Sequence, residues 1–551
     1  MSIVVFRARE VVTLDRSCPH GEAVAVSEGR VLHVGTRAEV AEALRDQQFH
    51  EDDRYLDHVI VPGFIEAHGH LFSDGALGQL VWTGYDDRPR PDATVASGCR
   101  SLDEVIARLR EHASSSDSLV VGYGFDPVFH DGRSLRREDL DQVSTTHGVV
   151  VVNASGHLAY ANSLQMHRCD VTALTDVAGV IKDAEGVPTG EFHETAMALV
   201  LDAQSVMASD PQRAVRDGGE LLRQVGVTSA SDMALFAAGD AFETYARVVN
   251  EQDFPVRVFY SPSLGDMARR FSDADLFDHF VALRERRTEK FAMGPIKLIA
   301  DGSIQGFTGK LKWPGYCAGE DHGFLILDED DIVTRMQPYH DAGFQFAIHT
   351  NGDGATEVAL RAIGRVLARS PRLDHRHRLE HCQMATRAMF RTMATLGVAV
   401  NLFSNHIFYW GDIHRTKTMG PDKARRMDAA RSALGEDVVI SLHSDHPVTP
   451  VNPLFTMWCA VNRLTRSGHL LGAEERLTPL EALEAVTLGS AFLLHRDDEM
   501  GSIEVGKLAD FTVLSENPLR VDPMRIKDIE VIDTVLGGEP MGEVSQRSTD
   551  G

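Results

Sequence analysis

The chain has 551 residues, too many for one ordinary domain and enough to bury a large core. Asp and Glu number 81 against 55 Lys and Arg, which gives a net charge of −26. So large an acidic excess repels phosphate backbones and anionic lipid, and it therefore argues against nucleic-acid and membrane partners. The six cysteines are scattered and form no CxxC pair, as in the reduced proteins of the cytoplasm.

Two features of the chain agree with a cytoplasmic protein. In the opening MSIVVFRARE, Arg7 and Arg9 interrupt a short apolar stretch, unlike the basic-then-apolar layout of a signal peptide. We find no apolar run of the length that crosses a bilayer.

Segments rich in β-branched residues occur near both ends of the chain. The first are IVVFRAREVVTL and EAVAVSEGRVLHVG, in which Glu28-Gly29 favours a tight hairpin turn. The last are KLADFTVL and DIEVIDTVLGGEPM. We expect one small composite β-sandwich domain, built from residues 1–58 and 500–551.

Residues 59–499 alternate short β-branched runs with helix-like segments such as DGATEVALRAIGRVLAR and TRAMFRTMATL. Eight strands alternating with helices predict an α/β protein of the (β/α)₈ barrel class. The eight strand candidates are VIVPGFIEA, GVTSAS, PVRVFYS, PIKLIA, FQFAIH, HRLEH, GVAVNLF and VVISLHS.

One interval is too long for a simple barrel. Roughly 150 residues separate His70 from Gly226, far more than a normal connection between a strand and a helix. This interval contains its own strand candidates, SLVVGYGF and GVVVVNASG, and a helix candidate, SLDEVIARLREHA. We expect an inserted subdomain over about residues 74–220, placed after the first strand and therefore over the active-site mouth.

Polar side chains follow several of the predicted strands, at the barrel end where active sites form. Imidazole nitrogen and carboxylate oxygen are ligands that suit Zn²⁺ or a similar divalent ion. The first two histidines are separated by one glycine, and residues i and i+2 of a strand share a face. The set comprises His68 and His70, Lys297, His349, His381 and Asp445.

Each of these residues has an ordinary explanation when taken alone. An HxH pair occurs by chance, a lysine is usually solvated, and an aspartate often caps a helix. A barrel in which the histidines are incidental and no metal binds therefore stays open. The ordered occurrence of all six at strand ends favours a metal centre.

Eight motifs between about residues 60 and 515 resemble one enzyme family. They are PGFIEAHGH, GVPTGEFHE, GVTSASDM, IKLIADGSIQGFTG, HTNGD, HRLEHCQ, SDHPVTPVNPL and GSIEVGKLADFTVL. Together they resemble the amidohydrolase superfamily in its amidohydrolase-3 branch, which includes YtcJ-like proteins and N-substituted formamide deformylases. The segment IQGFTG stands where the wider branch continues LGSRTA-like, and this difference favours the deformylase type.

The resemblance implies a (β/α)₈ metallohydrolase with one or two divalent ions, of which Zn²⁺ is the first expectation. It implies that Lys297 is an N6-carboxylysine bridging two ions, because a free ammonium would be repelled by cations. An unmodified lysine beside a single ion stays open. The implied metal ligands are His68, His70, Lys297, His349, His381 and Asp445.

The implied reaction is hydrolysis of a non-peptide C–N bond in a small amide, either an N-substituted formamide or another acyl amide with an apolar N-substituent. Asp445 would act as general acid and base. His157 resembles the substrate-side histidine of the family. Asp301, Ser303 and Gln305 are further candidates for substrate binding, although Asp301 and Ser303 could instead hold the loop after the fourth strand. Candidate walls of an apolar pocket are Trp313, Phe403 and Tyr409.

Two other functions stay open. The same scaffold supports hydrolysis of carbamates, esters or cyclic amides, and deamination. A non-catalytic regulator is the second alternative, but such relatives lose metal ligands, whereas every expected ligand position is filled here. By resemblance we also expect a homodimer or a homotetramer.

Overall fold

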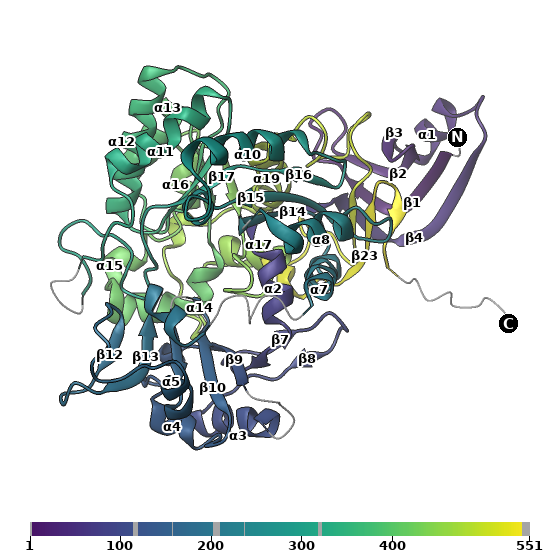
Figure 1. Cartoon of the computed structure of the whole chain (residues 1–551). Helices are drawn as coiled ribbons and strands as arrows, with labels where there is room; N and C mark the ends of the chain where they lie inside the picture. The colour runs from purple at the N-terminus through teal and green to yellow at the C-terminus, as the bar shows by residue number, and fades with distance from the viewer. Residues whose placement is uncertain are drawn as a thin grey trace.

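In the computed structural model, strands from both ends of the chain share one seven-stranded sheet (Figure 1). The model describes residues 3–113, 119–156, 158–201, 210–235, 237–317 and 322–542. Within these ranges, no helix has the length and apolar character needed to span a membrane. The strands are, in sheet order, β24 (Glu539–Pro540), β23 (Val531–Leu536), β22 (Phe511–Leu514), β4 (Phe49–Pro62), β1 (Ile3–Val12), β2 (His20–Ser27) and β3 (Arg30–Gly35).

The predicted hairpin turn at Glu28-Gly29 is confirmed, because these two residues join the antiparallel strands β2 and β3. Their φ angles are 52° and 74°, both left-handed, as a two-residue type I′ turn requires. Helix α1 (Arg37–Ala43) follows β3 and begins with a capping box formed by Thr36 and Glu39.

Two further sheets are parallel and carry the eight predicted strands. Ser263, just after β15, bridges in parallel to Lys297 on β17, and β21 contacts β5. This arrangement is consistent with the predicted (β/α)₈ barrel. The sheets comprise β5 (Phe64–Gly69), β14 (Val227–Leu235), β15 (Arg257–Pro262) and β16 (Phe291–Met293), and β17 (Ile296–Ile299), β18 (Phe346–Thr350), β19 (Arg378–His381), β20 (Ala399–Leu402) and β21 (Ile440–Leu442).

The first predicted strand, VIVPGFIEA, is two strands in the structure. Strand β4 ends at Pro62 in the seven-stranded sheet, and β5 begins at Phe64 in the parallel sheet. Gly63 lies between them, and a Cβ there would stand 2.1 Å from Thr228 Oγ1, so only glycine fits. The chain therefore changes sheets at a residue without a side chain. The short strand β16 was not predicted.

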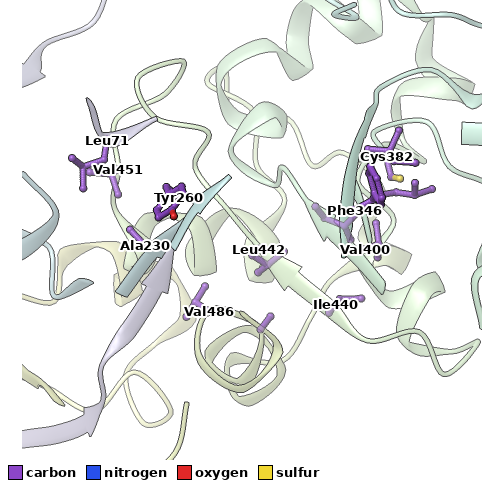
Figure 2. Packing of buried hydrophobic residues seen from close by; sticks show 14 of the residues in the cluster. Leu71, Ala230, Tyr260, Phe346, Cys382, Val400, Ile440, Leu442, Val451 and Val486 are labelled. Atoms are coloured by element: carbon purple, nitrogen blue, oxygen red, sulfur yellow. The ribbon is translucent and has the colours of Figure 1, made fainter. Parts of the chain in front are cut away.

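The helices between the parallel strands pack their apolar faces on the sheets and form one large core (Figure 2). The predicted helices DGATEVALRAIGRVLAR and TRAMFRTMATL are α12 (Asp353–Arg369) and α13 (Arg387–Leu396). The apolar residues of α12 recur with helical spacing, so one face of the helix is buried. Other helices of this part are α7 (Pro211–Gln224), α8 (Gly239–Val249), α10 (Asp273–Glu285), α11 (Glu329–Asp341), α16 (Ala430–Leu434), α17 (Pro453–Asn462), α18 (Pro479–Glu484) and α19 (Ser490–Leu493).

The interval after β5 begins with α2 (Leu71–Leu77) and then forms a separate layer, seen in blue in Figure 1. The predicted strands and helix of this insertion are confirmed as β9, β10 and α3 (Leu102–Ala113). Its six-stranded sheet runs β12 (Val180–Lys182), β13 (Pro188–His193), β11 (Leu158–Ala161), β10 (Gly148–Asn153), β9 (Leu119–Phe125) and β6 (Val81–Trp82).

Three polar contacts join the insertion to loops of the parallel-sheet part. Trp410 Nε1 donates to Asp126 Oδ2 at 3.3 Å, and the Tyr123 hydroxyl donates to the Pro447 carbonyl at 3.4 Å. Arg466 pairs with Asp86 through two contacts of 2.6 Å. Because Trp410 and Pro447 follow β20 and β21, the insertion covers the C-terminal ends of those strands.

A buried ion pair joins the two-ended sheet to the parallel sheets. Arg257 on β15 is 2% exposed, and its Nε lies 2.7 Å from Asp510 Oδ2, just before β22. Asp510 Oδ1 also accepts from the Gly537 amide at 2.7 Å. Each partner therefore depends on the other to avoid an uncompensated buried charge.

We expect Arg257→Ala to lower the free energy of unfolding by about 3–5 kcal/mol, because it leaves the Asp510 carboxylate buried without its cation. Urea unfolding followed by circular dichroism measures the loss. Arg425→Ala is the control, since Arg425 and its partner Glu474 are 55% and 46% exposed, and it should have a much smaller effect. Equal losses in the two variants would contradict the prediction.

Candidate metal centre

The HxH motif ends strand β5 and directs both imidazoles to one carboxylate. His68 Nε2 lies 3.4 Å and His70 Nε2 lies 3.3 Å from the same oxygen, Asp445 Oδ1. A Cβ at Gly69 would stand 2.0 Å from His446 Nε2, so the residue between the two histidines must be glycine. The spacing of two places both rings on one side, as strand geometry requires.

The other predicted histidines converge on the same point. The His381 ring centroid lies 4.7 Å from that of His68 and 4.5 Å from that of His349. His381 Nδ1 is 3.0 Å from Nε2 of His443, which follows β21. In the described part of the chain, two trios have ligand atoms within 4.8 Å of one another: His68, His381 and His443, and His68, His70 and Asp445.

Left-handed backbone turns two of these side chains toward the centre. Strand alternation would place Glu380 and His381 on opposite faces, yet both contact His68. His381 has φ 67° and Asp445 has φ 53°, values that cost L-residues free energy and that occur at functional sites. The sequence gives no indication of this backbone conformation.

The ionisation of the cluster suits a cation. Burial lowers the pKa of His68 and of His381, so both imidazoles are neutral and can offer a lone pair. Burial alone would raise the pKa of Asp445, but the nearby His68 and His70 outweigh it and hold this pKa well below its usual range. Asp445 Oδ1 is buried without a hydrogen bond of good geometry. Neutral imidazoles around an unsatisfied carboxylate oxygen fit a divalent metal ion.

Glu380 supports the centre from inside the parallel sheet, a role that sequence reasoning missed. Its Oε2 lies 2.6 Å from His68 Nδ1 and accepts from Asn401 Nδ2 at 3.0 Å. Arg378 on the same strand compensates the charge, with its Nε 2.6 Å from Glu380 Oε1. A carboxylate on Nδ1 fixes the imidazole so that Nε2 faces the cluster. Two opposite charges spaced by two within HRLEH were the available signal.

Lys297 on β17 points into the same cluster. Its side chain is buried, and Nζ lies 3.4 Å from His68 Nε2. Burial lowers the pKa of Lys297 to about 8. A substantial fraction of the amine is therefore neutral near physiological pH.

A cavity opens onto the cluster and contains two of the predicted substrate residues, Ser303 and Gln305. Asp301 does not line it: its carboxylate accepts from three backbone amides, those of Lys310, Asn351 and Gly352, at 2.8–2.9 Å. These bonds tie together the loops after β17 and β18, the structural alternative for Asp301. His157 lies outside the described residues. The cavity is lined by Ser155, Ser303, Gln305, His349, Asn351, His381, Gln383, Phe403, His406, Asp445 and Val448.

His406, which sequence reasoning also missed, closes one side of this cavity from helix α14 (Asn405–Ile413). Its Nε2 lies 3.1 Å from Gln305 Oε1, and its Nδ1 lies 2.9 Å from His414 Nε2. His414 Nδ1 in turn contacts Thr418 Oγ1 at 2.7 Å. This chain fixes the tautomer of a neutral imidazole, because burial lowers the pKa of His406. No family motif contained His406.

The three predicted aromatic walls have different positions. Phe403 lines the cavity beside His381, and Tyr409 lines a second pocket nearby. Trp313 is 87% exposed and lines neither pocket, so its prediction was wrong. It lies in the long loop after β17, where tryptophan composition alone does not reveal exposure.

We expect Glu380→Gln to weaken zinc binding about 10- to 100-fold, because His68 loses the carboxylate that orients it. Competition with a chromogenic chelator measures the affinity. Glu475→Gln is the matched control: Glu475 is also buried, but it accepts from Ser432, away from the histidine cluster. Unchanged affinity in Glu380→Gln, or an equal loss in the control, would count against the role of Glu380.

Comparison with known proteins places this cluster in a family. N-substituted formamide deformylase of Arthrobacter pascens is 28% identical, with 96% of each chain covered. Protein LONG AFTER FAR-RED 3 of Arabidopsis thaliana is 27% identical, with 96% of this chain and 90% of that protein covered. The fold is similar to that of an uncharacterized metal-dependent hydrolase from Pyrococcus horikoshii, with a TM-score of 0.74, 19% identity and coverage of 95% and 99%. A family model described as "Amidohydrolase family" matches residues 57–541, and the chain therefore belongs to the amidohydrolase family.

Proposed function

We propose that this protein is a metal-dependent hydrolase that cleaves a C–N bond of a small amide. The observation that carries the proposal is the convergence of imidazoles, a lysine and an aspartate on one buried point beside a cavity. Family membership and a fold like that of a metal-dependent hydrolase support the same class of reaction. We further propose that the parallel strands form a (β/α)₈ barrel whose C-terminal end holds this site.

The residues that would hold the metal are those predicted from the sequence, and Zn²⁺ suits their nitrogen and oxygen donors. A divalent ion bound there supplies a water of lowered pKa and a Lewis acid for a carbonyl oxygen. We assign the ligand positions to His68, His70, His349, His381 and Asp445, with Lys297 between them. His443 lies close enough to His381 to act as a ligand or to orient it.

Asp445 is the proposed proton carrier. Its carboxylate is ionised and faces the cavity, so it can accept the proton that water releases on attacking the amide carbon. When the C–N bond breaks, Asp445 returns this proton to the leaving nitrogen. The products are a carboxylic acid and an amine. The same residue thus serves as base in the first half of the reaction and as acid in the second.

Other side chains of the cavity would orient the substrate. Asn351 Nδ2 lies 3.0 Å from His349 Nε2 and 2.8 Å from the Gly302 carbonyl, which fixes the position of that imidazole. Gln305 and the neutral His406 offer hydrogen bonds to an amide group. Because these groups are largely buried and mutually bonded, the site is ordered before substrate binds.

Lys297 is proposed to carry a carboxylate. A neutral lysine amine adds to carbon dioxide, forming an N–C bond and releasing one proton, and the result is an anionic carbamate. The buried amine with a pKa of about 8 is suited to this addition. In this form the side chain would bridge two ions, whereas the unmodified lysine would stand beside one.

Elemental analysis of protein purified without chelator tests the metal centre. We expect about two divalent ions per chain, and about one in Lys297→Met, which cannot form the carbamate bridge. Dialysis against a chelator should abolish hydrolysis, and added zinc should restore it. About one ion in the wild type would retain hydrolysis and remove the bridge. A wild-type protein that carries no metal and gains no activity with zinc would refute the proposed function.

Asp445→Asn should reduce turnover of an amide substrate by about 10³-fold, within the range for loss of a general acid–base, while most of the metal stays bound. Hydrolysis is followed by amine release, and metal content is measured on the same sample. Asp253→Asn, at a carboxylate that is 73% exposed, should retain full activity. Wild-type turnover in Asp445→Asn would eliminate its proposed role.

The class of substrate is tested with a panel that compares formamides, acetamides, carbamates, esters and cyclic amides of equal size. We expect amides to be hydrolysed at the highest kcat/KM. A preference of more than tenfold for esters or carbamates would reassign the reaction within the family.

A further inference from the structure

A second pocket lies beside the catalytic cavity, where the insertion meets the loops after β20 and β21. It encloses about 750 Å³, part of it open to solvent. Most of its wall is apolar or aromatic. We call it the aromatic pocket and define it by five rings, those of Trp82, Tyr85, Phe129, Tyr409 and Trp410.

The aromatic pocket is continuous with the catalytic cavity. Val448, three residues after Asp445, lines both, and the adjacent residues Ala154 and Ser155 line one each. The Trp410 ring stacks on His406 with centroids 4.5 Å apart and planes at 30°. One face of this partition thus belongs to the aromatic pocket, and the other belongs to the site of chemistry. A molecule held at the metal centre can therefore extend into the aromatic pocket.

The charged side chains around the aromatic pocket have partners within the described structure. Arg466 pairs with Asp86, Arg88 pairs with Asp74, and Arg100 pairs with Asp87. Arg466 also lies over the rings of Tyr85 and Phe129, at 5.6 and 5.2 Å from their centroids. Because these charges are compensated, the pocket favours an uncharged occupant, and its flat walls favour a planar ring.

The shape of the aromatic pocket is set by packing within the insertion. A Cβ at Gly84 would lie 2.2 Å from the Trp82 ring, and one at Gly124 would lie 2.3 Å from it, so the two glycines make room for this indole. Trp82 Nε1 donates to the Asp86 carbonyl at 2.8 Å, and Trp410 Nε1 is held by Asp126. Fixed rings lose little freedom when a ligand binds.

We propose that the aromatic pocket binds an arylalkyl substituent of the substrate while the scissile amide lies in the catalytic cavity. The inference rests on the proposed amide hydrolysis and deepens it, because it assigns the group next to the scissile bond. The insertion then selects the substrate, and the strand ends cleave it. Small amides without such a group would be poor substrates.

Two variants and a graded substrate series test the proposal. The series is N-methyl-, N-hexyl- and N-(2-phenylethyl)formamide. Phe129→Ala removes one wall of the aromatic pocket, and Ala154→Phe obstructs its junction with the catalytic cavity. In each, the ratio of kcat/KM for the phenylethyl compound to that for the methyl compound should fall at least tenfold. Phe271→Ala is the matched control: this ring is also partly exposed but lines neither cavity, and the ratio should stay unchanged.

A binding measurement separates this inference from the proposed reaction. Quenching of tryptophan fluorescence by N-(2-phenylethyl)urea, a poor electrophile, reports the pocket through Trp82 and Trp410. Its Kd should rise at least tenfold in Phe129→Ala. If no formamide is hydrolysed but this binding and its loss are observed, the pocket stands and the reaction is wrong. If formamides are hydrolysed with the same ratio in all variants, or if wild-type protein does not bind the urea, the pocket assignment is overturned.

Discussion

The buried contact between His68 and Glu380 is the interaction on which the site depends. Both side chains are almost fully buried, and a carboxylate in such a place needs hydrogen bonds and a compensating cation. Arg378 and Asn401 meet that need on one side of Glu380, and His68 meets it on the other. With its Nδ1 engaged, His68 presents Nε2 to Asp445 and Lys297. The geometry of the metal centre therefore follows from a charge network inside the parallel sheets.

The insertion and the parallel-sheet part divide the work of the protein. The strand ends bring ligands together because parallel strands present their C-terminal ends on one side of the sheet. The insertion covers that side and contributes most of the aromatic pocket, with Tyr409 and Trp410 supplied by the loop region after β20. A scaffold of this kind retains its metal chemistry while the covering layer changes. Family membership accordingly indicates the reaction class more firmly than the substrate.

Much of the fold was predictable from local pattern. The parallel strands are buried on both faces and read as short apolar runs, so all eight candidates correspond to strands of the structure. Helix α12 was predictable because its apolar residues repeat with helical spacing. The exception was VIVPGFIEA, where a change of sheet at Gly63 leaves no mark on the apolar pattern. Loop residues such as Trp313 were harder, because burial in a loop depends on distant neighbours.

The sequence by itself determined the family, the order of the strands and the candidate ligands, because strand periodicity and motif spacing are local properties of the chain. Only the tertiary structure decided which side chains meet. Glu380 supports His68 across 312 positions of sequence, His406 reaches Gln305 across 101, and His381 turns inward through a left-handed backbone angle. The aromatic pocket, too, draws its walls from segments far apart in the chain. Contacts of this kind arise from the packing of whole elements, and no short stretch of residues encodes them.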